Sequence, residues 1–238
     1  MIKKYAGFNF TFGVIFIAQL MTESIFLTEI LAIEKLHFIT KPLIVISLLA
    51  LLIYHTGLRG RFAKRIGLGL FFGLAGDVFL MFQEINSTFF IWGLISFLIG
   101  HIFYISAFYL DYLTHTDIGK KYINWSLVGF GVFCLLFYLF LQPYLGSMKM
   151  PVLFYAIVIS LMAVAGISRY DRVNSFSFKI IFIGAILFII SDSILVINKF
   201  VAPFSMGGTL IMATYMLAQY MITIGAIERK FKKRVKNE

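Results

Sequence analysis

Eight apolar runs, separated by short polar breaks, occupy most of the 238 residues of this chain. A helix needs about 20 apolar residues to cross the hydrocarbon core of a bilayer, and a transmembrane strand would instead alternate polar and apolar residues. The sequence therefore predicts an all-α, polytopic bundle of eight transmembrane helices in a single transmembrane domain over residues 1–238, with spans at about 6–23, 38–55, 65–82, 88–110, 123–141, 150–168, 178–197 and 207–227.

The shortage of charge excludes a soluble catalytic domain. Only 13% of the residues are charged and 61% are hydrophobic, whereas soluble domains carry about 25% charged residues. Eight spans would use roughly 160 residues, so only short connections remain. Any chemistry that this protein performs must therefore lie inside the bilayer or at its edge.

The net charge of +10 is distributed unevenly over the loops. With the N-terminus on the cytoplasmic side, that side carries 17 of the 21 Lys and Arg residues, and the opposite side carries Lys35, Lys41, Lys149 and Lys199. The positive-inside rule then predicts that both termini are cytoplasmic. The basic excess indicates topology and not a nucleic-acid partner, and we expect the basic tail over residues 228–238 to contact anionic lipid headgroups.

The N-terminal apolar run and the single cysteine narrow the possible functions only slightly. The N-terminal run has the outline of a signal peptide, but residues 19–22 offer no pattern of small residues for cleavage, so we interpret it as the first span. Cys134 is the single cysteine, which excludes intrachain disulfides and cysteine-based zinc sites.

Two aspartates stand out among the eleven acidic residues, because only Asp77 and Asp192 sit well inside an apolar run. Each lies five residues before the outer end of its run, so at about 1.5 Å per residue they share one depth in the outer half of the bilayer. A structural alternative is that each holds the bundle together through hydrogen bonds. Two carboxyl groups at one depth favour a functional site.

The surroundings of these aspartates resemble each other at an offset of 115 residues. The same offset joins Tyr104 to Gln219. A parallel four-plus-four repeat is therefore one interpretation, and it would place a binding site between the halves. The two matching segments are Gly76-Asp77-Val78-Phe79-Leu80 and Ser191-Asp192-Ser193-Ile194-Leu195.

Lys41 is the third charge in an unusual place. Residues 42–52 are too few to span, so the helix must begin earlier and carry Lys41 about one turn into the membrane. A cation at a helix start opposes the helix dipole, so we expect an anionic partner, either an aspartate or a ligand phosphate. The alternative is a lysine that snorkels to the outer headgroups.

Several weaker candidates complete the set. Each of them alone is typical of a satisfied polar residue in a bundle core, but together they predict a polar cavity on the outer half. They are His101, Tyr104, Tyr155, Asn198, Tyr215 and Gln219. We expect Glu23 and Glu29 to lie in solvent at the outer boundary.

Five short segments, in this order and spacing, resemble the YhhN family of lysoplasmalogenase-like membrane proteins. The resemblance covers about residues 40–220 and implies hydrolysis of the vinyl ether bond of a lysoplasmalogen. The products would be a long-chain aldehyde and glycerophosphoethanolamine or glycerophosphocholine, with no cofactor and no metal. The segments are Thr40-Lys41-Pro42-Leu43, Gly76-Asp77-Val78-Phe79-Leu80, Gly100-His101-Ile102-Phe103-Tyr104, Ile190-Ser191-Asp192-Ser193, and Tyr215 with Gln219.

The residues add a mechanistic hypothesis to this resemblance. Protonating the outer vinyl carbon gives an oxocarbenium ion, to which water adds. Asp77 and Asp192 would divide the general acid and base roles in either order, as two carboxyl groups do in glycoside hydrolysis. Lys41 would bind the phosphate as a point charge. The supporting or substrate-binding set is His101, Tyr104, Tyr155, Ser191, Asn198, Tyr215 and Gln219.

Three other readings of the aspartate pair differ in strength. An intramembrane aspartyl protease needs a glycine where Leu74 stands, and a zinc amidohydrolase needs several intramembrane histidines where only His101 is present. Both fit poorly. The serious alternative is a proton-coupled transporter of small molecules or lipids, which paired aspartates in a pseudo-repeated bundle would serve equally well.

Overall fold

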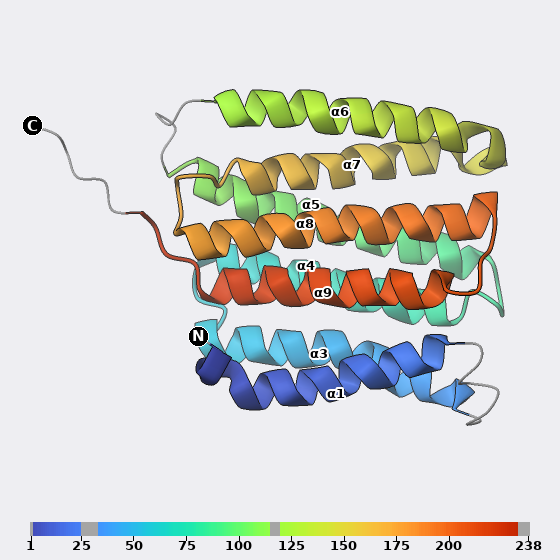
Figure 1. Ribbon diagram of the computed structural model, residues 1–238, viewed down its shortest axis with the longest axis horizontal. Helices are drawn as coiled ribbons and strands as arrows, with labels where there is room; N and C mark the ends of the chain where they lie inside the picture. Colours follow the sequence, from blue (N-terminus) through green and yellow to red (C-terminus); the bar gives the residue numbers. More distant parts are fainter. Residues whose placement is uncertain (1, 25–32, 115–119, 233–238) are drawn as a thin grey trace, which may run out of the picture.

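The part of the chain that the structure describes forms eight long helices that run alternately in opposite directions (Figure 1). The computed structural model describes residues 2–24, 33–114 and 120–232. Within these residues the named elements are all helical. The α-helices are α1 Ala6–Glu23, α3 His37–Thr56, α4 Gly60–Met81, α5 Thr88–Tyr112, α6 Lys121–Leu141, α7 Lys149–Ile167, α8 Ser175–Val196 and α9 Gly207–Ile227.

The helices coincide with the eight predicted runs to within a few residues. The largest difference is at α4, which begins at Gly60 and not near residue 65. The first turns of α4 carry Arg61, Lys64 and Arg65, which interrupt the apolar pattern but not the helix. Over the described residues, the prediction of an all-α fold with eight long helices is confirmed.

Six of the described helices, α3 and α5 to α9, are long and apolar enough to cross a membrane. The chain is therefore a multi-pass membrane protein. Helix α4 carries Asp77 in addition to its three basic residues, and α1 contains Asn9, Gln19 and Glu23, so both are less apolar than the rest. That α1 and α4 also span stays a prediction.

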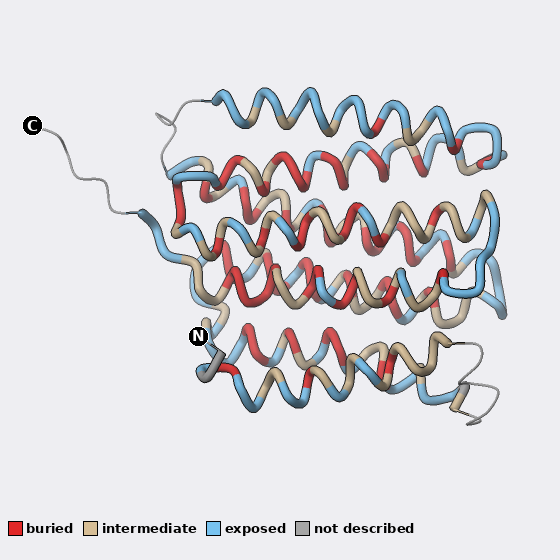
Figure 2. The backbone as a smooth tube through the Cα atoms, in the orientation of Figure 1, coloured by how far each residue is buried: buried red, intermediate tan, exposed pale blue. Residues whose placement is uncertain are grey.

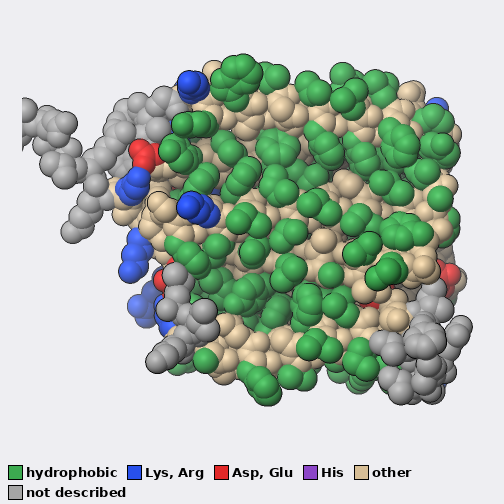
Figure 3. Space-filling view, viewed as in Figure 1, with side chains coloured by type: hydrophobic (Ala, Val, Ile, Leu, Met, Phe, Trp, Pro, Cys, Tyr) green, Lys and Arg blue, Asp and Glu red, His purple; other side chains and the backbone are tan. Residues whose placement is uncertain are grey.

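One end of the bundle gathers the basic side chains. Helix α1 begins and α9 ends at this end (Figure 1), and Figure 3 shows most Lys and Arg side chains of the visible face there. Lys4 and Tyr5 both donate hydrogen bonds to Glu228, at 2.5 Å, and the bond from Lys4 is the main cause of the lowered pKa of Glu228. The two ends of the described chain are thereby joined.

The core lies between the inner helices, and α6 lies at one edge. Helix α4 packs along α5, and α8 packs along α9, more closely than any other pairs. Helix α6 contacts mainly α7, and Figure 2 shows α6 exposed over almost its whole length. In a bilayer that exposed apolar surface faces lipid. The parallel four-plus-four repeat stays a prediction.

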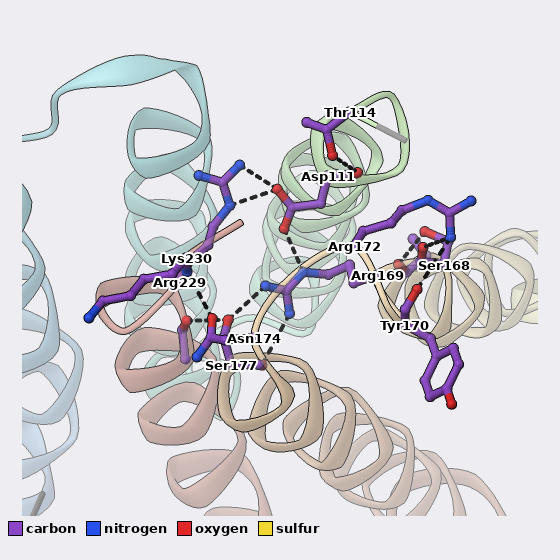
Figure 4. A network of polar contacts seen from close by, with 12 residues as sticks. Asp111, Thr114, Ser168, Arg169, Tyr170, Arg172, Asn174, Ser177, Arg229 and Lys230 are labelled. Atoms are coloured by element: carbon purple, nitrogen blue, oxygen red, sulfur yellow. Dashed lines mark hydrogen bonds and ion pairs between the residues drawn. The ribbon is translucent and has the colours of Figure 1, made fainter. Parts of the chain in front are cut away.

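A buried ion cluster stabilises the basic end (Figure 4). Asp111 at the end of α5 is completely buried, and it accepts hydrogen bonds from Arg169 Nε at 2.8 Å and Arg229 Nε at 2.6 Å. Arg169, also completely buried, donates to the Ser177 hydroxyl at 2.8 Å. We call Asp111, Arg169, Ser177 and Arg229 the arginine cluster. It joins α5, α8 and the segments that follow α7 and α9.

The arginine cluster corrects part of the sequence-based expectation. Only Asp77 and Asp192 were expected to be acids inside the bundle, yet Asp111 is buried as deeply as either. Asp111 directly follows the apolar run 88–110, a position typical of a solvated loop residue. Its partners Arg169 and Arg229 belong to the 17 basic residues that the sequence predicts on the cytoplasmic side, and both pair with this buried carboxylate.

Candidate active site

A polar cavity of about 230 Å³ lies at the end of the bundle opposite the arginine cluster. The ends of α1, α4 and α8 and the starts of α3 and α9 contribute to it, together with Phe97 of α5. Its polar and charged lining consists of Glu23, Lys41, Asp77, Gln83, Ser191, Asp192, Asn198 and Tyr215. Both predicted catalytic aspartates therefore face one cavity, from α4 and α8.

Asp77 is the more buried of the two, with 2% of its surface exposed. Its Oδ2 accepts a hydrogen bond from the Tyr215 hydroxyl at 2.7 Å. Tyr215 accepts in turn from Gln219 Nε2 at 3.2 Å, and Gln219 Oε1 accepts from the Tyr104 hydroxyl at 2.6 Å. This chain of hydrogen bonds, the Tyr104 relay, runs from α5 through α9 to α4 and fixes the orientation of Asp77.

Asp192 has a different environment. Its side chain is 13% exposed, and Oδ2 accepts a hydrogen bond from the Tyr155 hydroxyl at 2.6 Å. The same oxygen lies 3.1 Å from His101 Nε2. When Asp192 is ionised, this geometry requires the proton of a neutral His101 to be on Nε2. Helices α5, α7 and α8 thus converge on one carboxyl group.

Three glycines on one face of α4 allow these contacts. An added Cβ would lie 2.4 Å from the Tyr104 ring at Gly69, 2.7 Å from Gln219 Nε2 at Gly73, and 2.8 Å from the Phe97 ring at Gly76. Residues spaced four and three apart share a helix face. The close approach of α5 and α9 to α4 therefore depends on the absence of side chains beside Asp77.

Gly73→Ala should disturb the Tyr104 relay directly. The new methyl group must displace the amide of Gln219, and overpacking of this kind typically costs about 1–3 kcal/mol. For a chain of this length we expect the melting temperature in detergent to fall by about 2–12 °C. Gly129→Ala on α6 is the matched control, because an added Cβ there meets nothing within 4 Å. Equal melting temperatures for the two variants would contradict the close packing.

The structure brings the ten predicted site residues together, six of them in the cavity wall and four behind it. Those that line the cavity are Lys41, Asp77, Ser191, Asp192, Asn198 and Tyr215. Those that reach it through a hydrogen bond to a lining residue or along the Tyr104 relay are His101, Tyr104, Tyr155 and Gln219.

Two of the lining residues have their polar atoms engaged with backbone. Ser191 donates its hydroxyl to the carbonyl of Ile211 at 3.0 Å. Asn198 Oδ1 accepts from the backbone N–H of Phe204 at 3.0 Å, which shapes the connection from α8 to α9. Lys41 is half-buried in the cavity wall and forms no ion pair with another described residue. Its charge interacts with Asp77 in the same cavity wall, but its ammonium group has no direct partner among the described residues.

Sequence reasoning missed Glu23 and Gln83. Glu23 was expected in solvent, but its side chain is half-buried and lines the cavity. The sequence does carry a signal for Glu23. Gln19 and Glu23 are polar residues four apart at the end of an apolar run, a spacing that places both on one helix face. Glu29, for which the same expectation was made, and residues 233–238 of the basic tail lie outside the described residues.

Comparison with known proteins shows the family of the chain. The sequence model of the YhhN family matches residues 36–226, a range that includes both aspartates and excludes α1. A Homo sapiens protein named lysoplasmalogenase TMEM86A is 33% identical, over 71% of this chain and 67% of its own length. Its Bos taurus namesake is 32% identical over the same shares. No solved structure matches. This chain belongs to the YhhN family.

Proposed function

We propose that this protein hydrolyses the vinyl ether bond of lysoplasmalogens, which releases a fatty aldehyde and a glycerophospho-headgroup. The observation that carries the proposal is the polar cavity, in which Asp77, Asp192 and Lys41 meet inside an otherwise apolar bundle. The relatives named lysoplasmalogenase support the choice of substrate class. A lysolipid already resides in the membrane, so its bond can reach a cavity between membrane helices.

The reaction needs one proton donor and one proton acceptor. A protonated carboxyl group gives its proton to the outer vinyl carbon, and the electrons of the double bond leave an oxocarbenium ion. Water adds to that ion and loses a proton to the second carboxylate. In the collapse of the hemiacetal, the second carboxyl group returns its proton to the departing alcohol oxygen, and the first carboxylate takes the proton of the hemiacetal hydroxyl as the aldehyde forms. The reaction consumes one water, and both carboxyl groups end in the protonation states in which they began.

The two carboxyl groups have environments that differ enough to divide these roles. Asp192 has two neighbouring donors, Tyr155 and His101, and is the more accessible of the pair. Asp77 has one hydrogen-bond donor, Tyr215, and is almost completely buried, and the charges of Lys41 and Glu23 act on it in opposite directions. Donors stabilise an ionised carboxylate, so we assign Asp192 as the base that takes the proton from water and Asp77 as the acid. Separate environments for paired carboxyl groups are a general route to such a division.

Product chemistry tests the proposal. Purified protein in detergent receives a lysoplasmenyl-ethanolamine and, separately, its saturated-ether analogue, and fatty aldehyde is measured. We expect aldehyde from the vinyl ether alone, because the saturated ether has no double bond to protonate. Absence of aldehyde under varied pH and detergent would contradict hydrolysis. If the protein instead moves protons across the membrane of proteoliposomes when lipid is added, the alternative function, a proton-coupled transporter, is favoured.

Lys41→Met should weaken substrate binding more than it slows chemistry. In the proposed complex Lys41 binds the phosphate, whose charge is the same in the ground state and the transition state, although the charge of Lys41 also interacts with Asp77. We therefore expect KM to rise by about 10-fold to 100-fold, in line with a hydrogen bond to a charged group, with kcat nearly unchanged. Lys149→Met, an exposed lysine at the start of α7, is the control. A loss confined to kcat would contradict phosphate binding.

The orientation in the membrane is also a proposal. The basic end of the bundle, with both ends of the described chain, would face the cytoplasm, and the cavity would open in the outer half of the bilayer. The position of the Lys and Arg side chains supports this orientation (Figure 3).

A further inference from the structure

Glu23 gives the polar cavity a charge that hydrolysis alone does not require. It is the last residue of α1 and shares the cavity wall with Lys41, Asp77 and Asp192. The proposed chemistry uses the two aspartates, and Lys41 binds phosphate. Helix α1 also lies outside the segment that matches the YhhN family. A third carboxyl group in a cavity within an apolar bundle is costly unless a cation meets it.

The carboxylate of Glu23 is held in place by buried groups. Its Oε1 accepts a hydrogen bond from Gln19 Nε2 at 2.9 Å. Gln19 is completely buried, and its Oε1 accepts from the Thr40 hydroxyl at 2.5 Å. Thr40 is the neighbour of Lys41 in the sequence. One chain of hydrogen bonds therefore fixes the carboxylate of Glu23 on α1 relative to the first turns of α3, which carry Lys41.

The second oxygen of Glu23 faces the start of α9. A Cβ added at Gly208 would lie 2.7 Å from Glu23 Oε2, so only a glycine leaves room for this oxygen at the cavity wall. The hydrogen bond from Gln19 occupies Oε1, whereas no side chain among the described residues donates to Oε2. Glu23 thus keeps one oxygen for a ligand.

The charges of the cavity lining are unbalanced. Three carboxyl groups line it, and Lys41 is the one basic residue among the described lining residues. Lys199 is nearby but exposed, and it donates to Gln83 at 3.3 Å. Glu23 and Lys41 form no ion pair with each other in the described structure. Opposite charges held apart in one wall complement a ligand that carries both signs.

We propose that Glu23 binds the ammonium group of a zwitterionic lysolipid headgroup whose phosphate is bound by Lys41. This inference rests on the proposed function for its substrate class and adds the basis of headgroup selection. The ammonium supplies the cation that the cavity lacks, and the phosphate satisfies Lys41. A lysolipid whose headgroup is a bare phosphate would satisfy Lys41 but leave Glu23 unpaired beside added negative charge.

Headgroup-matched substrates test this selection. Two vinyl ether lysolipids with the same chain are compared, one with a phosphoethanolamine headgroup and one with phosphate alone. We expect Glu23→Gln to lower kcat/KM for the zwitterionic lipid by about 10-fold to 100-fold and to leave the anionic lipid unchanged or improved. Glutamine keeps an oxygen for the hydrogen bond from Gln19. An equal loss on both lipids, or no loss on either, would overturn the proposal.

Two further measurements separate this inference from the proposed function. Glu84→Gln removes an exposed acid in the turn after α4. It should leave the ratio of kcat/KM for the zwitterionic lipid to kcat/KM for the anionic lipid unchanged. Binding of the uncleavable saturated-ether lipids is then followed by thermal shift. The wild type should be stabilised more by the zwitterionic lipid, and Glu23→Gln should lose that difference. If the wild type releases no aldehyde, hydrolysis fails, while this binding comparison still decides the role of Glu23.

Discussion

Replacing Asp77 or Asp192 by asparagine should lower the rate of aldehyde release by about 10²-fold to 10⁴-fold, the usual contribution of one general acid or base. Asparagine keeps the size of the side chain and an oxygen that can accept the hydrogen bond from Tyr215 or Tyr155, but it neither gives nor takes the proton. The measurement is fatty aldehyde released from the vinyl ether lysolipid at saturating substrate.

Folding must be checked beside this rate. We expect both variants to elute as the wild type does on size exclusion in detergent and to melt within a few degrees of it. Glu84→Gln is the control for removal of an acid at the same end of the bundle. If either aspartate variant retains the full rate, the paired-carboxyl mechanism is wrong even where the reaction is right. If only Asp192→Asn is inactive, Asp77 orients the helices through Tyr215 and does not transfer a proton.

Asp111→Asn should destabilise the protein strongly without altering the cavity. The substitution leaves the completely buried guanidinium of Arg169 without its carboxylate. Removing one partner of a buried ion pair costs about 3–5 kcal/mol, because an uncompensated charge stays in the interior. For a chain of this length we expect the melting temperature in detergent to fall by about 6–20 °C.

An exposed ion pair provides the matched control for Asp111. Asp171 pairs with Lys232, and their side chains are 43% and 47% exposed. Exposed pairs contribute about 0–1 kcal/mol, so Asp171→Asn should melt close to the wild type. The arginine cluster and the polar cavity lie at opposite ends of the bundle, so kcat of Asp111→Asn should be unchanged well below its melting temperature. A fall in melting temperature no larger than that of Asp171→Asn would contradict the account.

The positions of the helices could be predicted because each is a continuous apolar run bounded by polar residues. The start of α4 is the instructive exception. Arg61 and Lys64 are exposed at the basic end of the bundle, where charged side chains reach water while the backbone remains helical. An apolar pattern therefore marks where a helix is surrounded by lipid or protein, and not where its first hydrogen bond forms.

Some of the residues that form the site could be predicted from their depth in the bilayer alone. Asp77 and Asp192 lie near the same end of their helices, and helices that run in the same direction bring such residues to one level. Their partners could not be predicted, because a contact such as that of Asp192 with Tyr155 depends on which helices are neighbours. Tyr104 and Gln219 were identified as equivalent positions of a repeat, and the structure adds that they bond to each other.

Glu23 and Asp111 were misjudged for a common physical reason. Both stand at the end of an apolar run, where a charged residue is most often solvated. Whether such a residue is buried depends on what lies over that end of the helix. Gly208 and Gln19 enclose Glu23, and Arg169 and Arg229 enclose Asp111. All except Gln19 come from distant parts of the chain.

The arginine cluster implies an order of events during biogenesis. In the proposed orientation, Arg169 and Arg229 are two of the basic residues that keep their loops on the cytoplasmic side while the chain inserts. At that stage they must be free and charged, because the folded neighbours do not yet exist. Only after α9 has inserted can Arg229 reach Asp111 and close the end of the bundle. In that orientation, the two side chains would first direct insertion of the chain and then stabilise the finished bundle through their ion pairs with Asp111.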